Sequence, residues 1–363
     1  MSGADTAERL AEDRLHQARR QFDAEVTYLN TATLGLPPRA AVDALDAVQR
    51  EWRAGTADAL GYDDPVAAAR AAYAGMAGVD VGWVAVGSQV SVFAGLVAAS
   101  LPDGSEVLTA TGDFTSIVFP FAAQAGRGVR VRAVPLERIA AEVTRATTLV
   151  AVSAVQSADG RLVDLDALEA ACAATGTQVL LDTTQSAGWL PIDASRFAYT
   201  VCGGYKWLLA ARGTAYFTIA PRLQDQVVPH TAGWYAGADR WSSIYGLPLR
   251  LADDARRFDV SPAWHAWVSA APALELLTCV GSSALHRHAT GLADRFRAQV
   301  GAPPGESAIV SLAVDPRAAE AMRTANVVGA MRAGRLRLSF HVMNGAEDAD
   351  HAAQVLRPYV LPG

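Results

Sequence analysis

The sequence predicts an α/β protein with a three-layer α/β/α large domain, whose sheet is mostly parallel, and a smaller α+β C-terminal domain. Its 363 residues are 51% hydrophobic and 19% charged, which is enough apolar material to bury a large core. From residue 38 to about residue 220, short apolar runs alternate with Ala-rich helical stretches, a pattern typical of a parallel sheet covered by helices. We expect a large domain over 28–250 and a small domain formed by 1–27 and 251–363.

The expected elements follow the hydrophobic pattern along the chain. A charged amphipathic helix is predicted over 7–22, and the segment YLNTATLGLPP (28–38) is irregular and ends at a double proline. Strands are predicted at 82–86, 106–110, 128–134, 148–153, 178–181, 198–202 and 214–219. Because these runs are continuously apolar, both faces of their sheet should be covered. After a Gly- and Trp-rich loop (229–262), we expect helices at 263–280, 282–298, 316–322 and 346–356 and strands at 308–313 and 335–341.

Composition and charge disfavour several classes of function. The chain has 31 Lys+Arg against 37 Asp+Glu, a formal charge of −6 and no basic cluster, so no nucleic-acid partner is expected. The longest apolar stretch, 90–101, is too short to cross a bilayer, and the polar N-terminus predicts no secretory signal and no membrane partner. Three cysteines without CxxC spacing and seven scattered histidines predict no metal site and a cytoplasmic location.

One residue type is almost absent from the chain. Every basic residue among the 31 Lys+Arg is arginine except Lys206. Arginine provides a fixed charge, but at neutral pH it cannot lose its proton and act as an amine nucleophile. A bias toward G+C-rich codons would explain the missing lysines, but not why this one remains. The pattern therefore predicts that Lys206 has a chemical role.

The surroundings of this lysine match the requirements of pyridoxal 5'-phosphate. Asp182, Gln185 and Lys206 each lie just past a predicted strand, where open α/β sheets bind ligands. The cofactor needs an amine for a Schiff base, a carboxylate on its ring nitrogen, a donor near its phenolic oxygen and an anion site for its phosphate. Lys206, Asp182 and Gln185 would provide the first three. Ser88 and Gln89, which open a predicted helix after Gly87, would bind the phosphate.

Each of these signals is weak when it is taken alone. An aspartate at a strand end is often a helix N-cap, a Gly-Ser pair before a helix is often only a turn, and a single lysine can be a surface residue. The prediction therefore rests on their occurrence together, in this order and at this spacing.

The motif DTTQ (182–185), followed by GGYKWL around Lys206 and by Gly213-Thr214, resembles the class V aminotransferase family of fold-type I pyridoxal-phosphate enzymes. That family includes cysteine desulfurases, kynureninase and isopenicillin N epimerase, and the resemblance extends along nearly the whole chain. It implies the fold-type I architecture, with Lys206 as the catalytic residue. It further implies a homodimer whose active sites lie at the subunit interface.

The resemblance also assigns roles to residues outside these motifs. Phe114 in GDFTS would stack on the cofactor ring, and Tyr205 would contact the phosphate as in the kynureninase pattern. Ser261 before Pro262 would reach the phosphate of the partner subunit. In the segment YLNTATLGLPP, Asn30 would contact the substrate.

A carboxylate-binding arginine is expected in the C-terminal strand. Strand alternation in RLRLSFH places Arg335, Arg337, Ser339 and His341 on one face and the apolar residues on the other. One guanidinium from that polar face can hold an α-carboxylate with two hydrogen bonds. The resemblance selects Arg337, whereas a solvated strand face is a fair alternative for Arg335.

The reaction is predicted from how the sequence departs from the family pattern. The 314–334 region has no cysteine, where desulfurases carry a mobile nucleophile, and we expect Cys279 to lie in the core. Gly203 replaces the usual serine or threonine phosphate donor, and Ser157 replaces a usual asparagine. We expect a lyase-type β-elimination that cleaves a C–S bond in a modified amino acid. Transamination is the alternative, followed by epimerisation and by a cofactor-free scaffold; a nicotinamide-dependent oxidoreductase is disfavoured because no GxGxxG follows the first strand.

Overall fold

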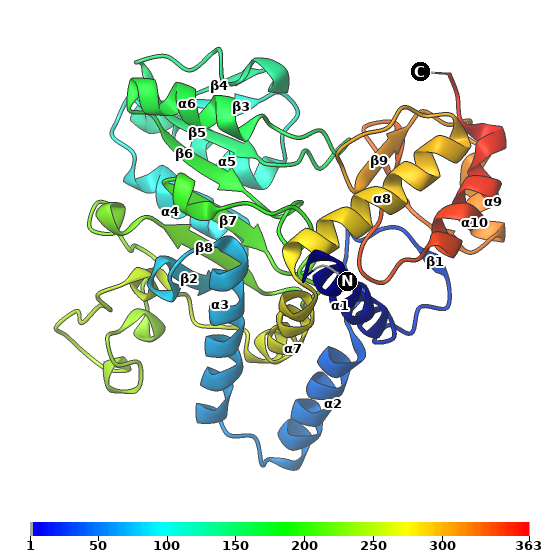
Figure 1. Ribbon diagram of the computed structural model, residues 1–363. Helices are drawn as coiled ribbons and strands as arrows, with labels where there is room; N and C mark the ends of the chain where they lie inside the picture. The colour runs from blue at the N-terminus through cyan, green and yellow to red at the C-terminus, as the bar shows by residue number, and fades with distance from the viewer. Residues whose placement is uncertain (1–2, 363) are drawn as a thin grey trace.

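A seven-stranded sheet forms the centre of the large domain in the computed structural model, which describes residues 3–362 (Figure 1). β8 is antiparallel to both of its neighbours, β2 and β7, and all other neighbouring strands run parallel. The predicted mostly parallel sheet is therefore confirmed, and each predicted run overlaps one strand, with ends that differ by no more than two residues. In sheet order the strands are β2 (Val84–Gly87), β8 (Ala215–Ile219), β7 (Tyr199–Gly203), β6 (Gln178–Asp182), β5 (Thr147–Ser153), β3 (Glu106–Ala110) and β4 (Arg130–Val134).

Helices cover both faces of this sheet and make the three layers. Alternate residues of one strand point to opposite faces, so Ala85 packs with α4 (Val90–Ser100) and α5 (Thr115–Ala122). Val84 and Val86 face α3 (Asp63–Ala77) and α7 (Trp264–Val280) on the other side. α6 (Leu165–Thr175) covers β5 and β6 on that same side, and α2 (Arg39–Ala54) packs against α7. The apolar runs in the sequence are thus explained by burial on both faces.

A second core lies in the C-terminal part of the chain. Its antiparallel sheet has the order β11 (Ala330–Arg332), β12 (Arg335–Ser339), β9 (Ile309–Leu312). The helices of this part are α8 (Ser282–Val300), α9 (Ala318–Thr324) and α10 (Ala346–Leu356). Leu336 and Leu338 pack with Phe296 of α8, which confirms the predicted apolar face of the 335–341 strand. The division at residue 251 stays a prediction, because α7 packs on α2 and α3 while α8 contributes to the second core.

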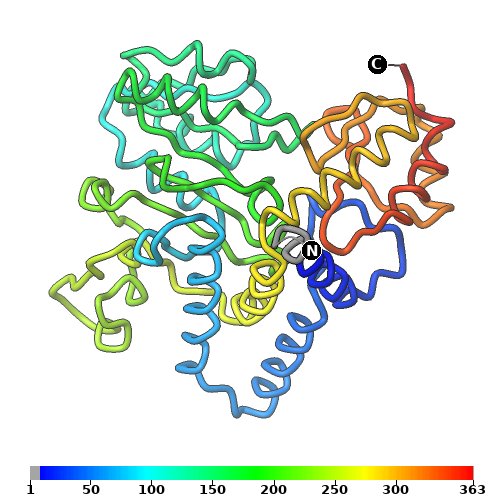
Figure 2. Tube along the Cα trace, in the orientation of Figure 1, coloured from blue at the N-terminus to red at the C-terminus, as the bar shows by residue number. Residues whose placement is uncertain are grey.

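The N-terminal segment runs between the two cores and ends beside the lysine loop. After α1 (Gly3–Arg19), β1 (Thr27–Tyr28) pairs with β10 (Val327–Val328), and the path of the chain can be followed in Figure 2. The backbone N–H of Gly35 then donates to the carbonyl oxygen of Tyr205 at 2.9 Å. A side chain at Gly35 would overlap the carbonyl oxygen of Lys206, so this close approach requires glycine. Residues 28–38 thereby join the small domain to the loop that carries Lys206.

The described residues also bear on membrane and metal binding. No single helix among residues 3–362 is long and apolar enough to cross a membrane. Within the same range, no group of three or more His, Cys, Asp or Glu side chains is arranged to hold a metal ion.

Candidate active site

All of the predicted cofactor residues except Ser261 meet in one cavity at the carboxyl ends of β6 and β7. This position is where open α/β sheets bind ligands, because neighbouring parallel strands end at the same edge. Most of the predicted cofactor residues lie in its wall, together with polar residues that sequence reasoning did not assign. The lining residues are Ser88, Gln89, Val90, Ser91, Phe114, Ser116, Ser153, Ser157, Asp182, Thr184, Gln185, Gly203, Tyr205, Lys206, Arg212 and Thr214.

Lys206 lies in a tight loop that follows β7, and its side chain is only 6% exposed. The loop is closed by hydrogen bonds from Gly204 N to Thr214 O at 2.9 Å and from Ala210 N to Gly204 O at 3.0 Å. The amine Nζ lies 5.0 Å from the centre of the Phe114 ring. Burial lowers the pKa of Lys206 to about 8, an effect partly opposed by the negative charge of Asp182. The amine is therefore much closer to its reactive, neutral form at physiological pH than an ordinary lysine.

Asp182 is the last residue of β6 and lies in the floor of the cavity. Its carboxylate accepts a hydrogen bond from Thr184 N at 2.8 Å, but no ion pair to it forms among the described residues. Burial raises the pKa of Asp182 to about 6, although the hydrogen bonds from Thr184 and the charge of Lys206 oppose this. Buried carboxylates are normally paired, so this site fits a positively charged ligand atom.

Two aromatic rings lie close to the lysine amine. Phe114 precedes α5, and its backbone N–H donates to the Asp113 carboxylate at 2.7 Å. Asp113 also accepts from Ser153 N at 2.8 Å, which ties this turn to the end of β5. The ring of Tyr205 has the Lys206 amine at 5.8 Å and the guanidinium carbon of Arg212 at 5.2 Å from its centre. Phe114 and Tyr205 thus both lie next to the Lys206 amine, while their contacts with the cofactor ring and the phosphate stay predictions.

The expected phosphate site lies at the N-terminus of α4. Ser88 and Gln89 precede the helix, and the backbone N–H of Val92 donates to the Gln89 carbonyl oxygen at 3.2 Å. Arg212 lines the same cavity, and sequence reasoning did not assign it. A signal was present in the sequence, since Gly203 lacks the hydroxyl group of the family pattern and the nearby Arg212 carries a positive charge. Phosphate and guanidinium groups match in geometry and charge.

Gln185 lies in the cavity, but its amide is fully engaged. Trp207 Nε1 donates to Gln185 Oε1 at 2.7 Å, which fixes the orientation of the amide. Gln185 Nε2 donates to Ala32 O at 3.0 Å and to Ser157 Oγ at 2.9 Å. The role of Gln185 at the phenolic oxygen stays a prediction, and it requires one of these two bonds to be exchanged.

Arg337 is buried beside this network. Its Nη2 donates to Thr33 Oγ1 at 2.7 Å, and its Nη1 donates to the carbonyl and hydroxyl oxygens of Ser157. The side chain is 1% exposed, and its Nε has no hydrogen-bond partner among the described residues. Burial, and then the neighbouring Arg332, lower the pKa of Arg337 to about 10. Arg337 is thus a buried arginine with no carboxylate partner among the described residues, and the Ser157 hydroxyl group links it to Gln185.

Three predicted site residues, Arg337, Asn30 and Ser261, are not among those that line the cavity, although Arg337 contacts the lining residue Ser157. Asn30 makes a β-bridge to Ser339, and its buried Oδ1 has no hydrogen-bond partner among the described residues. Ser261 is exposed, while Val260 N donates to Val86 O at 3.0 Å and anchors the loop near the end of β2. The contact of Ser261 with a partner subunit and the contact of Asn30 with substrate stay predictions.

The prediction that Cys279 belongs to the core is wrong. Cys279 lies near the end of α7 and is exposed, because it falls on the side of the helix that does not pack on α2 and α3. Cys172 and Cys202 are buried, and burial raises the pKa of the Cys172 thiol to about 11. None of these three cysteines lines the cavity.

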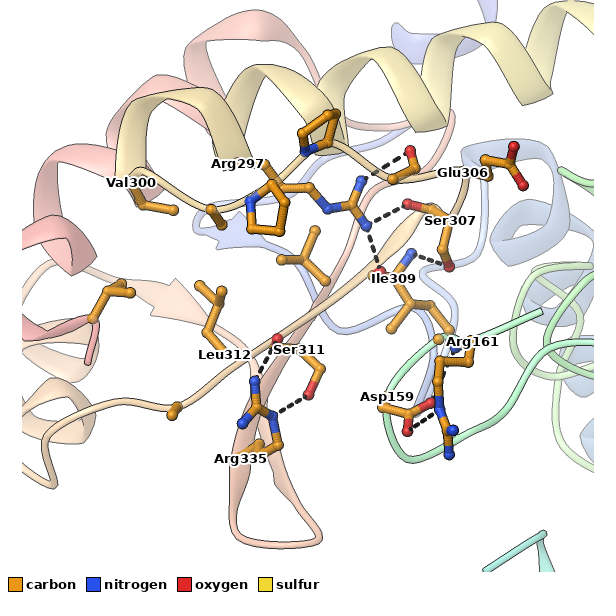
Figure 3. Close-up of a pocket in the computed structure, with 18 of the residues that line it drawn as sticks. Asp159, Arg161, Arg297, Val300, Glu306, Ser307, Ile309, Ser311, Leu312 and Arg335 are labelled. Atoms are coloured by element: carbon orange, nitrogen blue, oxygen red, sulfur yellow. Dashed lines mark hydrogen bonds and ion pairs between the residues drawn. The ribbon is translucent and has the colours of Figure 1, made fainter. Parts of the chain in front are cut away.

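A larger cavity of about 820 Å³ lies between the small domain and residues 159–162 of the large domain (Figure 3). Its arginines are already engaged with the protein. Arg297 Nη2 donates to Ser307 O and to Ile309 O, both at 2.9 Å, and Arg335 Nε donates to Ser311 Oγ at 3.2 Å. Because the only lysine and the unpaired aspartate lie in the other cavity, we place the chemistry there.

Comparisons with known proteins agree with this geometry. Residues 85–325 match the family model for class V aminotransferases. The chain is 30% identical over 236 residues to the uncharacterized aminotransferase YcbU of Bacillus subtilis (strain 168), covering 60% of this chain and 61% of YcbU. It is 26% identical over 319 residues to the isopenicillin N epimerase of Streptomyces clavuligerus, covering 80% and 79%. It is 29% identical over 310 residues to the kynureninase of Deinococcus radiodurans, covering 79% and 74%.

Solved structures share the fold. The cystine C–S lyase C-DES, in complex with its reaction product cysteine persulfide, matches with a TM-score of 0.82 and 22% identity over 93% of this chain and 98% of that chain. A C-DES mutant with glycine covalently linked to its PLP cofactor matches with a TM-score of 0.84 and 22% identity over 94% and 99%.

Proposed function

Because this chain belongs to the class V aminotransferase family, whose model matches most of it, we propose that it is a pyridoxal-5'-phosphate enzyme acting on an α-amino acid. The observation that carries the proposal is the state of its single lysine. Lys206 is buried beside Asp182 and Phe114, and burial lowers its pKa to about 8. A cofactor-free scaffold would have no need to bury an amine and a carboxylate, both without close ion-pair partners, in one cavity.

The donor set of the cavity fits the cofactor. When bound, the cofactor supplies a protonated ring that stabilises negative charge at the α-carbon of an amino acid. Lys206 Nζ would hold the cofactor covalently, and Asp182 would face its ring nitrogen, where a cation neutralises the buried carboxylate. Ser88, Gln89 and Arg212 would hold the phosphate at the N-terminus of α4.

The residues of this chain also supply what a substrate requires. Arg337 would bind the α-carboxylate, since its guanidinium is buried without a carboxylate partner and is linked to the cavity through Ser157. Lys206 Nζ, once released from the cofactor, would remove the proton from the substrate α-carbon, because a pKa near 8 suits a general base at neutral pH. Phe114 would cover the ring and limit access of water to this proton transfer.

For the reaction type we propose β-elimination with cleavage of a C–S bond in a modified amino acid. Elimination needs a base and an anchored carboxylate, but it needs no nucleophile to accept the leaving group. No cysteine among the described residues lines the cavity, which argues against a mechanism that transfers sulfur to a thiol. The C–S lyase C-DES, whose fold this chain shares, supports the same assignment. The free cysteines also support the proposed cytoplasmic location.

The test is to incubate the holoenzyme with β-substituted amino acids and to measure the keto-acid product together with the form of the cofactor. Elimination should release pyruvate and the β-substituent in equal amounts over many turnovers, without conversion of the cofactor to its amine form. Lys206→Arg should abolish the reaction. Conversion to the amine form, reversed by a keto acid and with the β-substituent retained, would contradict elimination.

That contrary result would support amino transfer, the second candidate. It is favoured by the relative YcbU, which is named an aminotransferase and is 30% identical to this chain over the matched residues. The residues assigned above would keep their roles. The difference would be that the proton removed by Lys206 is delivered to another carbon and the amino group is transferred, while the β-substituent stays on the substrate.

A further inference from the structure

Two arginines converge on one hydroxyl group beside the active-site cavity. Arg337 Nη2 donates to Thr33 Oγ1 at 2.7 Å, and Arg332 Nη2 donates to the same oxygen at 3.2 Å. Arg332 ends β11 and Arg337 lies in β12, and a two-residue turn, Ala333-Gly334, joins the two strands. The two guanidinium groups therefore lie on either side of a single hydroxyl group, and the short turn restricts how far the backbone of Arg332 can move.

Neither arginine has an acidic partner among the described residues. Two other arginines are similarly buried, and each is paired: Arg70 with Asp259 at 2.6 Å and Arg297 with Asp294 at 2.8 Å. Arg337 is more deeply buried than both, yet its partners are only hydroxyl and carbonyl oxygens. The other hydrogen bond of Arg332 goes to its neighbour's carbonyl oxygen, Met331 O, at 2.7 Å. A buried charge is normally paired, so Arg337 lacks a negative counter-charge, and Arg332 places a second, solvated positive charge beside it.

The pair lies close enough to the reactive amine to act on the same molecule. Arg337 is joined to the cavity through Ser157, which also accepts a hydrogen bond from Gln185. Besides burial, the positive charges of Arg337 and Arg332 both contribute to the lowered pKa of Lys206. Arg332 is exposed whereas Arg337 is buried, so a ligand held by Arg337 could meet Arg332 at its more exposed end.

We propose that the substrate is an amino acid with two carboxylates, in which Arg337 binds the α-carboxylate and Arg332 binds a second carboxylate carried by the β-substituent. This inference rests on the proposed function, because it assigns the two arginines to one amino-acid substrate. The α-carboxylate supplies the counter-charge that the buried Arg337 lacks, and the second carboxylate pairs with the exposed Arg332, which contacts the same Thr33 hydroxyl group. Arg332 is then the residue that selects the β-substituent.

The kinetic test uses two substrates that differ by one charge. S-(carboxymethyl)-L-cysteine and its neutral isostere S-(carbamoylmethyl)-L-cysteine have nearly the same size and leaving group. For the wild-type holoenzyme we expect kcat/KM to be at least about ten-fold higher for the carboxymethyl compound, and Arg332→Gln should remove that preference. In Arg332→Gln the carbamoylmethyl compound should lose much less kcat/KM than the carboxymethyl compound does, because it never pairs with this arginine.

Arg335→Gln is the matched control. Arg335 lies opposite Arg332 in the same hairpin, but its guanidinium binds Ser311 and lines the larger cavity (Figure 3). Arg335→Gln should leave kcat/KM unchanged for both substrates. An equal loss in the Arg335 and Arg332 variants, or a wild-type enzyme that does not distinguish the two substrates, would overturn the proposal.

A binding measurement separates this inference from the proposed reaction. Calorimetric titration of the holoenzyme with succinate and with its monoamide, succinamate, requires no turnover. Succinate should bind at least about ten-fold more tightly, and Arg332→Gln should abolish the difference. If no cysteine derivative is cleaved but this difference persists, the reaction type is wrong and the two-carboxylate site stands. Equal affinity for the two ligands would refute the site itself.

Discussion

Replacing the buried Asp182 with asparagine should stabilise the cofactor-free protein. Burial raises the pKa of Asp182 from 3.8 to about 6, so the folded protein binds this proton more tightly than the unfolded chain does. The stability contributed by the bound proton is complete below pH 3.8 and is lost as the pH rises through about 6. At about 1.4 kcal/mol per pKa unit, the ionised carboxylate costs the folded state about 3 kcal/mol above pH 6. Asparagine carries no charge at any pH and avoids that cost.

The assay is urea unfolding of the cofactor-free wild type and Asp182→Asn, followed by tryptophan fluorescence. At about pH 7.5 the variant should be more stable by about 2–3 kcal/mol, after allowance for weaker hydrogen bonds to Thr184. At about pH 5 the gain should fall to roughly half of that value, because Asp182 is then mostly protonated in the folded wild type. The same variant should bind the cofactor more weakly, since the ring nitrogen loses its counter-charge.

Asp259→Asn is the control with the opposite expected sign. Asp259 is also fully buried, but both of its carboxylate oxygens accept hydrogen bonds from Arg70, at 3.0 and 2.6 Å. Its replacement leaves a buried guanidinium unpaired and should cost about 3–5 kcal/mol. Two results would show that the ionised Asp182 carboxylate does not destabilise the folded protein. One is a loss of stability in Asp182→Asn at about pH 7.5, and the other is a gain in stability that does not shrink toward about pH 5.

Three further predictions concern the cofactor. The rate at which the cofactor-free protein captures pyridoxal 5'-phosphate should rise with pH through about 8, because the neutral form of Lys206 is the nucleophile. Stopped-flow absorbance measures this rate. A rate that rises only near the ordinary lysine pKa would contradict the prediction. Arg212→Gln should weaken cofactor affinity by about ten-fold in equilibrium titrations, whereas Arg222→Gln, an exposed arginine that does not line the cavity, should not. The protein should sediment as a homodimer, and Ser261→Ala should weaken cofactor binding without dissociating that dimer; a fully active monomer would refute the assignment of Ser261.

The fold could be predicted from the sequence because its strands are buried on both faces. Continuous apolar runs such as 148–153 predict strands covered on both sides, and β5 (Thr147–Ser153) is buried except at Thr148. Residues that follow these strands also share one edge of the sheet, which is why Asp182 and Lys206 could be placed together. The period of the C-terminal strand likewise predicted that Leu336 and Leu338 would face the second core.

The parts of the site that sequence reasoning missed depend on contacts between distant segments. The amide of Gln185 is engaged by Trp207 and Ala32, and nothing in its local sequence reveals these partners. Arg332 faces Thr33 only because the chain reverses at Ala333-Gly334, where Ala333 adopts a φ of 47°. Hairpin turns of this kind are normally recognised by asparagine or glycine at the first position, so alanine gives no signal.

The cavity holds an unpaired carboxylate, an unpaired guanidinium lies beside it, and the structure explains why the two do not neutralise each other. Asp182 ends a strand of the large domain and is held by Thr184, whereas Arg337 belongs to β12 of the small domain and is held by Thr33 and Ser157. Because each charge is fixed by hydrogen bonds, Asp182 within the large domain and Arg337 to Thr33 and Ser157 across the two domains, neither can swing toward the other without leaving those bonds unsatisfied. The stability lost by keeping them apart is recovered when ligands of opposite charge bind, a ring cation at Asp182 and a carboxylate at Arg337. Ligand binding should therefore also stabilise the contact between the two domains, since the two charges that it satisfies lie on different cores.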